Sequence, residues 1–350
     1  MLSPPCGSAW RRRAAGRSGE AAEVAGEPRT GAATSSRLGW VKAALSLGLL
    51  IFLVTRVDVR ATAEAFRGAR WWYLMAALAL YLAGVPLRAY RWQGLLSALH
   101  VAVPLRRLVS LYFVGTFFNN ILPTGVGGDV VRAYELSKDG AGAAAAASTV
   151  LVDRAAGLLV LLAVALISTL FSFRMIDLNL ALVIAGISLG SFAGVAVLLW
   201  DDLWRKVARH LPALRRLLAR RGLEAFYRSL QVYRGRAVVK ALVLSFIFNV
   251  VLIAVNYLIA LSMGVNISLW YFLLFIPLIS FSLILPVSVS GLGVREGAYV
   301  LLFGQAGVTA PLALAMSFAF YALNVATGLI GGVIYALQGL GWWTSSSGRG

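Results

Sequence analysis

The sequence predicts an all-α polytopic membrane protein: six full spans plus two re-entrant helical hairpins arranged as an inverted repeat. Composition is the first reason, because 60% of the 350 residues are hydrophobic and only 13% are charged. Soluble domains carry about 25% charged residues. The second reason is the recurrence of apolar runs of about 20 residues, the length that crosses a bilayer as a helix. The third is a glycine-rich pattern that the chain repeats within apolar surroundings.

Six apolar runs are long enough to span the membrane. In chain order they cover residues 38–55, 71–90, 155–173, 179–200, 237–263 and 310–339. Residues 1–37 are basic and lack the apolar core of a signal peptide, so we expect a disordered basic tail in the cytoplasm. Residues 341–350 are expected to form a second tail, which leaves 38–340 as the transmembrane domain.

Two further apolar runs end at a proline that is followed by glycines and an arginine. Residues 121–132 read Ile-Leu-Pro-Thr-Gly-Val-Gly-Gly-Asp-Val-Val-Arg, and residues 284–295 read Ile-Leu-Pro-Val-Ser-Val-Ser-Gly-Leu-Gly-Val-Arg. Placing Pro123 on Pro286 is a shift of 163 residues (286 − 123), and the same shift aligns the two arginines. Helices that break at corresponding positions of two halves are typical of substrate sites in transporters.

The charges of the loops predict the orientation. Residues 201–236 contain ten Lys and Arg against three acids, so we expect this basic loop in the cytoplasm. Its apolar residues recur at helical spacing, as in amphipathic helices that lie on a membrane surface. Residues 264–268 carry no charge and are expected outside. All loops then lie on their expected sides of the membrane only if residues 108–147 and 269–303 are re-entrant hairpins that enter from opposite faces.

Each repeat is then a span, a hairpin and a span, with 71–173 as the first repeat and 234–336 as the second. The two repeats have opposite orientations, and both chain termini are expected in the cytoplasm. One loop opposes this orientation. Residues 56–70 should lie outside although they carry four arginines against two acids, and the larger excess of the basic loop outweighs them.

The composition also argues against several functions. The net charge of +18 fits cytoplasmic loops and affinity for anionic lipid head groups, whereas nucleic-acid binding needs a longer basic soluble face. Cys6 is the single cysteine and the two histidines lie far apart, so we expect neither a disulfide nor a metal site. No Ser/His/Asp or Cys/His set stands out, so we expect no enzyme activity and no cofactor.

The arginines that end the two repeated patterns, Arg132 and Arg295, are the first candidates for a substrate site. A cation within the membrane is costly and indicates a functional site, and a guanidinium matches phosphate oxygens in a fixed fork. Glycine-rich turns direct backbone N–H groups toward an anion. The alternative is a structural lock, in which Arg132 pairs with Asp129 and Arg295 with Glu296. The candidate substrate-binding residues around the two turns are Asn119, Asn120, Gly127, Gly128, Asp129, Ser290, Gly291, Gly293 and Glu296.

Charged residues at the ends of two spans leave alternatives open. Asp153 and Arg154 either form a local lock at the cytoplasmic boundary or face a cavity beside the first hairpin, and both are candidate substrate-binding residues. Arg88, Arg91 and Trp92 lie at the end of the second span. For these three the sequence favours an aromatic and cationic anchor at the level of the lipid head groups.

Five motifs occur in order along the chain: Leu87-Arg88-Ala89-Tyr90-Arg91-Trp92, Phe117-Phe118-Asn119-Asn120-Ile121-Leu122-Pro123, Gly127-Gly128-Asp129-Val130-Val131-Arg132, Asp153-Arg154 and Pro286-Val287-Ser288-Val289-Ser290-Gly291-Leu292-Gly293-Val294-Arg295-Glu296-Gly297. Together they resemble the lysylphosphatidylglycerol synthase transmembrane-region family of flippase-like membrane proteins. This family is related to the flippase domain of multiple peptide resistance factors. The resemblance covers roughly residues 38–340, and the family more often has Glu at the position of Asp153.

The resemblance implies a lipid flippase-like transporter that moves an anionic phospholipid or a polyprenyl-phosphate-linked lipid across the cytoplasmic membrane. Its partners would be this lipid, the membrane and a glycosyltransferase or lipid-modifying enzyme, with no nucleic acid. No aminoacyl-transferase domain is expected within the 350 residues. The alternative is a membrane glycosyltransferase or an accessory protein that uses polyprenyl phosphate, for which Asp58 and Glu64 would be the acids on an outside loop.

Overall fold

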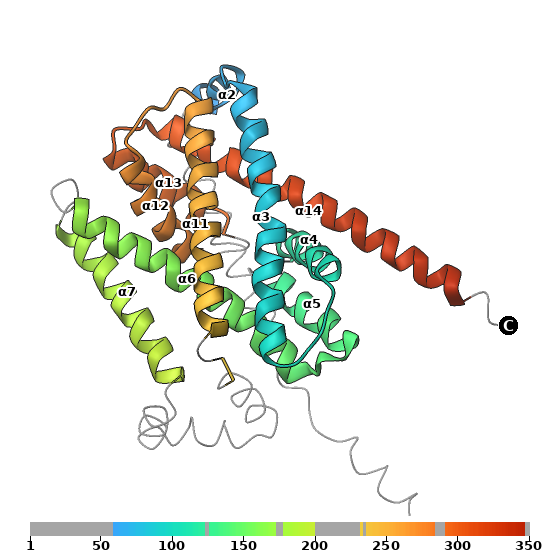
Figure 1. Ribbon diagram of the computed structural model, residues 1–350. Helices are drawn as coiled ribbons and strands as arrows, with labels where there is room; N and C mark the ends of the chain where they lie inside the picture. Colours follow the sequence, from blue (N-terminus) through green and yellow to red (C-terminus); the bar gives the residue numbers. More distant parts are fainter. Residues whose placement is uncertain are drawn as a thin grey trace, which may run out of the picture. The chain divides into compact units, whose positions relative to one another are not determined.

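The computed structural model describes residues 59–122, 126–172, 178–199, 232–233, 236–283 and 291–346, all within one compact unit, Lys42–Gly350. Every regular element in these ranges is a helix (Figure 1). In chain order the elements are α2 (Val59–Arg67), α3 (Trp71–Ala98), α4 (Leu105–Ile121), α5 (Gly127–Leu136), the π-helical turn η1 (Ser137–Ala141), α6 (Ala143–Ser172), α7 (Leu178–Leu199), α11 (Arg236–Ser262), α12 (Leu269–Ser282), α13 (Val294–Gln305) and α14 (Ala310–Ser346).

Four of these helices, α3, α6, α11 and α14, are long and apolar enough to cross a membrane. They coincide, in this order, with the predicted spans 71–90, 155–173, 237–263 and 310–339. Helix α7 covers the predicted span 179–200, with an apolar stretch at Ala181–Ala196. The predicted span 38–55, the tail 1–37 and most of the basic loop 201–236 lie outside the described residues. The described part of the chain is therefore a multi-pass helical membrane protein, as predicted.

Three helix boundaries differ from the sequence prediction. Helix α3 continues to Ala98, because its buried face extends past the predicted end of the span. The first hairpin is predicted to end at residue 147, but the alanines from Ala143 onward form the start of α6. Alanine has the highest helix propensity, and the run continues without interruption into the apolar span. Helix α14 extends to Ser346, so part of the predicted tail 341–350 is helical.

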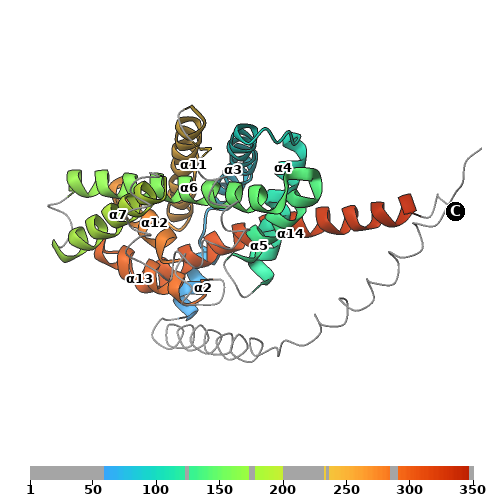
Figure 2. The same ribbon diagram turned by 90° about the horizontal axis from the view of Figure 1, so that it is seen from below.

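Helices α3 and α11 pack side by side and run in opposite directions (Figure 1). The backbone N–H of Arg70, just before α3, donates to the carbonyl of Ser262 at the end of α11, at 2.8 Å. Toward the other end, Lys240 Nζ donates to the hydroxyl of Tyr90 at 3.1 Å. Helix α6 crosses this pair and contacts both helices (Figure 2).

The shift of 163 residues seen in the sequence also relates the helices. It moves the start of α4 from Leu105 to residue 268, next to the start of α12 at Leu269, and in the same way it relates α3 to α11, α5 to α13 and α6 to α14. The contacts follow this correspondence, because α4 packs on α14 while α6 packs on α12. Each predicted repeat thus places its last helix against the hairpin of the other repeat.

Helices α4 and α5 form the first predicted hairpin and approach each other closely through glycines. A Cβ atom on Gly128 would lie 1.8 Å from the carbonyl oxygen of Gly115, so this contact requires glycine. Helix α14 packs on α4 in the same way, since a Cβ atom on Gly331 would lie 1.9 Å from the carbonyl oxygen of Phe113. The second limb of this predicted hairpin is therefore α5, followed by η1.

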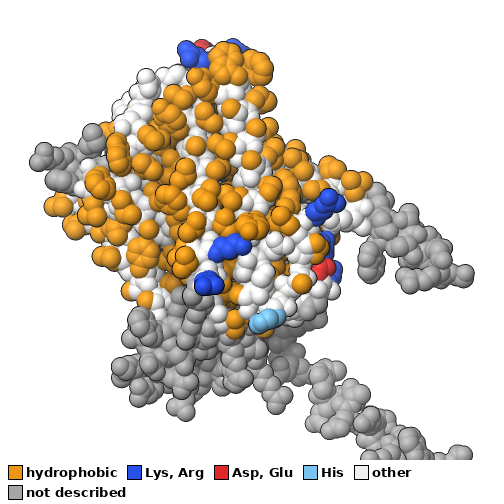
Figure 3. Space-filling model, viewed as in Figure 1, with side chains coloured by type: hydrophobic (Ala, Val, Ile, Leu, Met, Phe, Trp, Pro, Cys, Tyr) orange, Lys and Arg blue, Asp and Glu red, His pale blue; other side chains and the backbone are white. Residues whose placement is uncertain are grey.

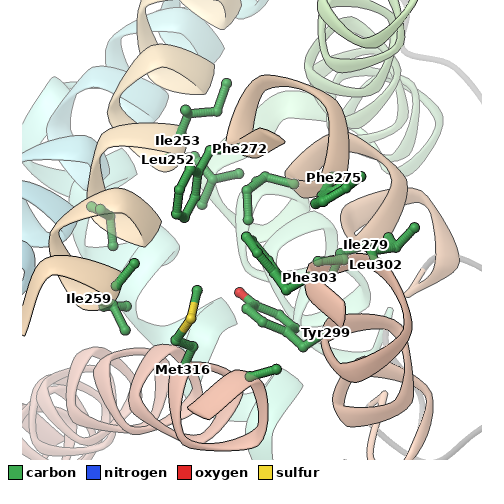
Figure 4. Packing of buried hydrophobic residues seen from close by; sticks show 14 of the residues in the cluster. Leu252, Ile253, Ile259, Phe272, Phe275, Ile279, Tyr299, Leu302, Phe303 and Met316 are labelled. Atoms are coloured by element: carbon green, nitrogen blue, oxygen red, sulfur yellow. The ribbon is translucent and has the colours of Figure 1, made fainter. Parts of the chain in front are cut away.

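The largest hydrophobic cluster of the described residues lies mainly among α11, α12, α13 and α14, with further members from α3, α6 and α7 (Figure 4). Phe303 is at its centre, with its ring centroid 5.1 Å from that of Phe272, 5.4 Å from that of Phe275 and 5.5 Å from that of Tyr299. Aromatic rings at these separations add to the stabilisation from burial. This packing holds the second hairpin against α11 and α14.

Hydrophobic side chains are spread widely over the described part of the face seen in Figure 3. On α11 the exposed residues Val239, Val243, Phe246 and Val250 recur every three or four positions, so they lie along one side of the helix. A continuous apolar surface of this kind suits contact with lipid acyl chains.

Candidate functional site

A cavity of about 300 Å³ lies among α3, α4, α5, α6, α11 and α12. Its charged lining residues are Arg88, Arg91, Asp129, Arg132, Asp153 and Arg154. Its uncharged polar lining residues are Tyr112, Thr116, Asn119, Asn249 and Ser280. Leu158, Leu161, Phe248 and Leu252 supply an apolar wall. The cavity therefore offers both a polar, charged surface and an apolar one.

Asp153 is the centre of the charged network. One carboxylate oxygen, Oδ1, accepts from Arg91 Nε at 2.8 Å, and the other, Oδ2, accepts from Arg132 Nη2 at 3.2 Å. The hydroxyl of Tyr112 also donates to Oδ2. These four side chains come from α6, α3, α5 and α4, so one buried carboxylate joins four helices. Hydrogen bonds to charged groups are among the strongest, and here they offset part of the cost of removing the charges from water.

Arg132 is held from several sides. Its Nη1 donates to Asp129 Oδ1 at 3.2 Å, one turn earlier on α5. Its guanidinium carbon lies 4.2 Å from the ring centroid of Trp92 and 3.7 Å from that of Tyr112. Aromatic faces attract a cation most strongly when both groups are away from water. Asp129 in turn forms a second ion pair, with Nε of Arg154.

Arg88 differs from the other cavity arginines. Its Nε and Nη2 atoms are inaccessible to solvent and have no hydrogen-bond partner among the described residues. Its guanidinium carbon lies 5.2 Å from the ring centroid of Tyr112 and 4.7 Å from that of Phe248. None of the ion pairs found within the described ranges includes Arg88. This arginine thus contacts aromatic faces but no acid.

Asn119, near the end of α4, lines the cavity. Its side-chain oxygen accepts from the backbone N–H of Gly128 at 2.8 Å, which satisfies one of the free amides at the start of α5. Gly127 is the first residue of α5. Asp129 lies in the first turn, where the helix dipole favours a negative charge. Asn120 points elsewhere, because its amide donates to the carbonyl of Asn324 on α14 at 3.2 Å.

Exposed ion pairs hold the far end of the first hairpin. Arg107, at the start of α4, donates to Asp139 of η1 at 2.9 Å and to Glu135 of α5 at 3.2 Å. Lys138 donates to Glu135 at 2.9 Å, and this hydrogen bond raises the pKa of the Lys138 ammonium. These pairs lie apart from the cavity and tie η1 and the end of α5 to α4.

The second hairpin arranges its charges differently. Arg295 Nε donates to Glu296 Oε1 at 3.1 Å and to Ser317 Oγ at 3.2 Å, and Nη2 also contacts the same carboxylate oxygen. The other oxygen of Glu296 accepts from the backbone N–H of Gly293 at 2.7 Å and so caps α13. Gly291 and Gly293 have φ values of 77° and 82°, a conformation that glycine adopts without strain.

The structure thus brings together one part of the predicted site residues. Asn119, Asp129, Arg132, Asp153 and Arg154 line one cavity, and Gly127 and Gly128 form the start of α5 just before Asp129. The lining of this cavity does not include Arg295, Glu296, Gly291 or Gly293. Ser290 lies outside the described residues. Both ion pairs of the alternative reading, Arg132 with Asp129 and Arg295 with Glu296, are present.

The position of Arg91 and Trp92 corrects the sequence prediction. The sequence favours an anchor at the head-group level, but both residues are buried and Arg91 pairs with Asp153. The sequence did contain a signal for the burial of Trp92, because the apolar residues Ala89, Trp92 and Leu95 recur at helical spacing and all three are buried in α3. Tyr112 and Ser245, the further partners of Asp153 and Arg91, carry no local signal, because their roles depend on contacts between helices distant in sequence.

The comparison with known families agrees with the motifs. The family described as "Lysylphosphatidylglycerol synthase TM region" matches residues 39–332, which include every residue that lines the cavity. No curated protein matched the chain.

Proposed function

The chain belongs to the lysylphosphatidylglycerol synthase TM region family, and we propose that it is a lipid flippase-like transporter of the cytoplasmic membrane. Its substrate is an anionic phospholipid or a polyprenyl-phosphate-linked lipid. The observation that carries this proposal is the charged cavity, whose four arginines and two aspartates give a formal charge of +2 (4 − 2) among apolar helices. Excess positive charge away from water is unfavourable unless an anion compensates it.

The relation between the two repeats supports transport from one leaflet to the other. Helices α3 and α11 correspond under the 163-residue shift and run antiparallel, as an inverted repeat requires. We propose that α4–α5 and α12–α13 are re-entrant hairpins that enter from opposite faces, with both chain termini in the cytoplasm. Movement of one repeat against the other would then open the cavity to each side in turn.

We assign the lipid head group to the polar side of the cavity. Asn119 and Arg154 lie on its wall, and Asp153 holds Arg91 and Arg132 in fixed positions. We assign Arg295 and Glu296 to a structural lock, because each satisfies the other and Glu296 also caps α13. The proposal includes no catalytic step for this chain.

The test is a transport assay with purified protein in phosphatidylcholine vesicles that contain a trace of fluorescent phosphatidylglycerol. A membrane-impermeant reductant bleaches label in the outer leaflet only. We expect nearly complete bleaching with the protein and roughly half without it. The same assay with fluorescent polyprenyl phosphate compares the two lipid classes. Bleaching equal to that of empty vesicles for both lipids would contradict the proposal, and lipid binding without transport would favour the accessory role beside a glycosyltransferase.

A further inference from the structure

Among the described cavity arginines, Arg88 has two nitrogens without a hydrogen-bond partner, Nε and Nη2, whereas Arg132 lacks a partner at Nε alone. Arg91 donates to Asp153 and Ser245, Arg132 to Asp129 and Asp153, and Arg154 pairs with Asp129. Arg88 has two nitrogens that are removed from solvent and make no hydrogen bond within the described part of the chain. A buried donor without a partner costs free energy, most of all on a charged group. An occupant of the cavity that supplied acceptor oxygens would remove this cost.

The charge balance points to the kind of occupant. Asp129 and Asp153 together form four ion-pair contacts with the other three arginines, and none with Arg88. Two aromatic rings, those of Tyr112 and Phe248, hold the Arg88 guanidinium but accept no N–H bond in its plane. The planar fork of a guanidinium matches two oxygens of a phosphate. The occupant that would complete the hydrogen bonds of Arg88 is therefore an oxyanion with two oxygens spaced to match the guanidinium fork.

The apolar wall of the same cavity indicates an amphiphile. Leu158, Leu161 and Leu252 line it together with Phe248, against which Arg88 packs. A free inorganic anion would gain nothing from these side chains, whereas a lipid would place the first part of its chains against them.

The second repeat has no equivalent of this arrangement. The shift of 163 residues moves Arg88 to Val251, Arg91 to Ala254 and Asp153 to Met316, all apolar. Tyr112 moves to Phe275, which keeps the ring but not the hydroxyl. The aromatic part of the framework is thus present in both halves, while the charges are present only in the first. The residues that correspond to Arg88, Arg91 and Asp153 in the second predicted repeat therefore cannot form a second site of this type.

We propose that Arg88 binds the phosphate of a net-anionic lipid in this cavity, through the two nitrogens that otherwise lack acceptors. Arg91, Arg132 and Asp153 are positioning residues that hold the walls and supply the remaining positive field. This assignment rests on the proposed transport of such a lipid, and it names the contact and the substrate class.

The test measures binding to the purified full-length protein in neutral detergent by titration calorimetry. The probes are dihexanoyl-phosphatidylglycerol, dihexanoylglycerol without phosphate, and inorganic phosphate. The variants are Arg88→Gln, Arg88→Lys and, as a matched control, Arg106→Gln, which removes an exposed arginine outside the cavity. We expect Arg88→Gln to weaken binding of the phosphatidylglycerol at least tenfold, Arg88→Lys to weaken it less, and Arg106→Gln to leave it unchanged. Binding of dihexanoylglycerol should not depend on Arg88.

Several outcomes would overturn the assignment. Equal affinity of Arg88→Gln and the parent protein for the phosphatidylglycerol would exclude Arg88 as the phosphate contact. Binding of inorganic phosphate as tight as that of the lipid would assign the cavity to a free anion. No acid among the described residues pairs with Arg88, so Arg88→Gln should melt within a few degrees of the parent protein. If Arg88→Gln does not fold, Arg88→Lys is compared with the parent protein instead.

The transport assay separates this assignment from the proposed function. Loss of binding in Arg88→Gln together with a parent protein that moves no lipid would leave the anion site standing and refute transport. Transport by the parent protein at a rate that Arg88→Gln matches would leave transport standing and refute the site.

Discussion

Arg91 on α3 and Asp153 on α6 form a hydrogen-bonded ion pair of 2.8 Å, with side chains only 5% and 2% exposed. The pair joins the two spanning helices of the first repeat. Ser245 of α11 accepts a second bond from Arg91 at 2.8 Å, which extends the contact to the second repeat. One buried pair of charges and its hydrogen bond to Ser245 thus link α3, α6 and α11.

Replacing Asp153 by Asn should be strongly destabilising. It keeps the shape of the side chain but leaves Arg91 and Arg132 without their shared counter-charge, and breaking a buried ion pair costs about 3–5 kcal/mol. The measurement is the free energy of unfolding in mixed detergent. Glu64→Gln, at an exposed acid of α2, is the control and should change it by less than about 0.5 kcal/mol. Equal stability of both variants would show that Asp153 is not the centre of the network.

Replacing Tyr112 by Phe separates the two roles of this side chain. The variant loses the hydroxyl that donates to Asp153 but keeps the ring beneath Arg132. Loss of a hydrogen bond to a charged group predicts a destabilisation of about 1.5–3 kcal/mol. Tyr112→Leu removes the ring as well, so it should cost more in the same unfolding measurement. Similar values for the two variants would mean that the ring contributes little.

The apolar spans could be predicted from the sequence because they depend on local properties. Apolar length identifies α3, α6, α11 and α14, and the paired proline and glycine motifs predict the two hairpins. The ion pairs Arg132–Asp129 and Arg295–Glu296 were open alternatives, since their partners lie three positions and one position apart. Arg91 and Asp153 are 62 positions apart, and no local pattern identifies such a pair.

The repeated sequence pattern also predicts that both of its arginines belong to the substrate site, but only one of them lines the cavity. Equivalent arginines predict equivalent sites, yet Arg132 lines the cavity and Arg295 does not. The reason lies in the neighbours. Glu296 directly follows Arg295 and satisfies it, whereas the position equivalent to Asp153 is Met316, which provides no counter-charge.

Replacing Gly128 by Ala tests the close contact between α4 and α5. Alanine is the better helix former by about 1 kcal/mol, so propensity alone predicts stabilisation. The added Cβ would lie 1.8 Å from the Gly115 carbonyl oxygen, so the helices must separate and Arg132 must move with α5. We therefore expect a lower melting temperature and weaker lipid transport. Gly186→Ala on α7, where a Cβ meets nothing within 4 Å, is the control and should melt no lower than the parent.

Single-cysteine labelling tests the proposed orientation in the membrane. In a Cys6→Ser background, Gly222→Cys in the basic loop should react with an impermeant maleimide only after the cells are opened. Gly264→Cys, in the uncharged loop after α11, should react in intact cells. The reverse pattern at both positions would show that the protein has the opposite orientation in the membrane. Labelling of both positions from the same side would show that the chain between them does not cross the membrane.

Arg132 and Arg295 occupy equivalent positions but should respond differently to substitution. Arg295→Met leaves Glu296 buried and unpaired, so we expect a loss of about 3–5 kcal/mol of stability. Adding Glu296→Gln removes the stranded charge and keeps an oxygen for the Gly293 amide, so most of the stability should return. If the pair is a structural lock, this double variant should transport lipid at the parental rate per folded molecule. Arg132→Met, which changes a residue of the cavity, should transport lipid more slowly than the parent protein. A folded double variant without transport would instead place Arg295 in the substrate site.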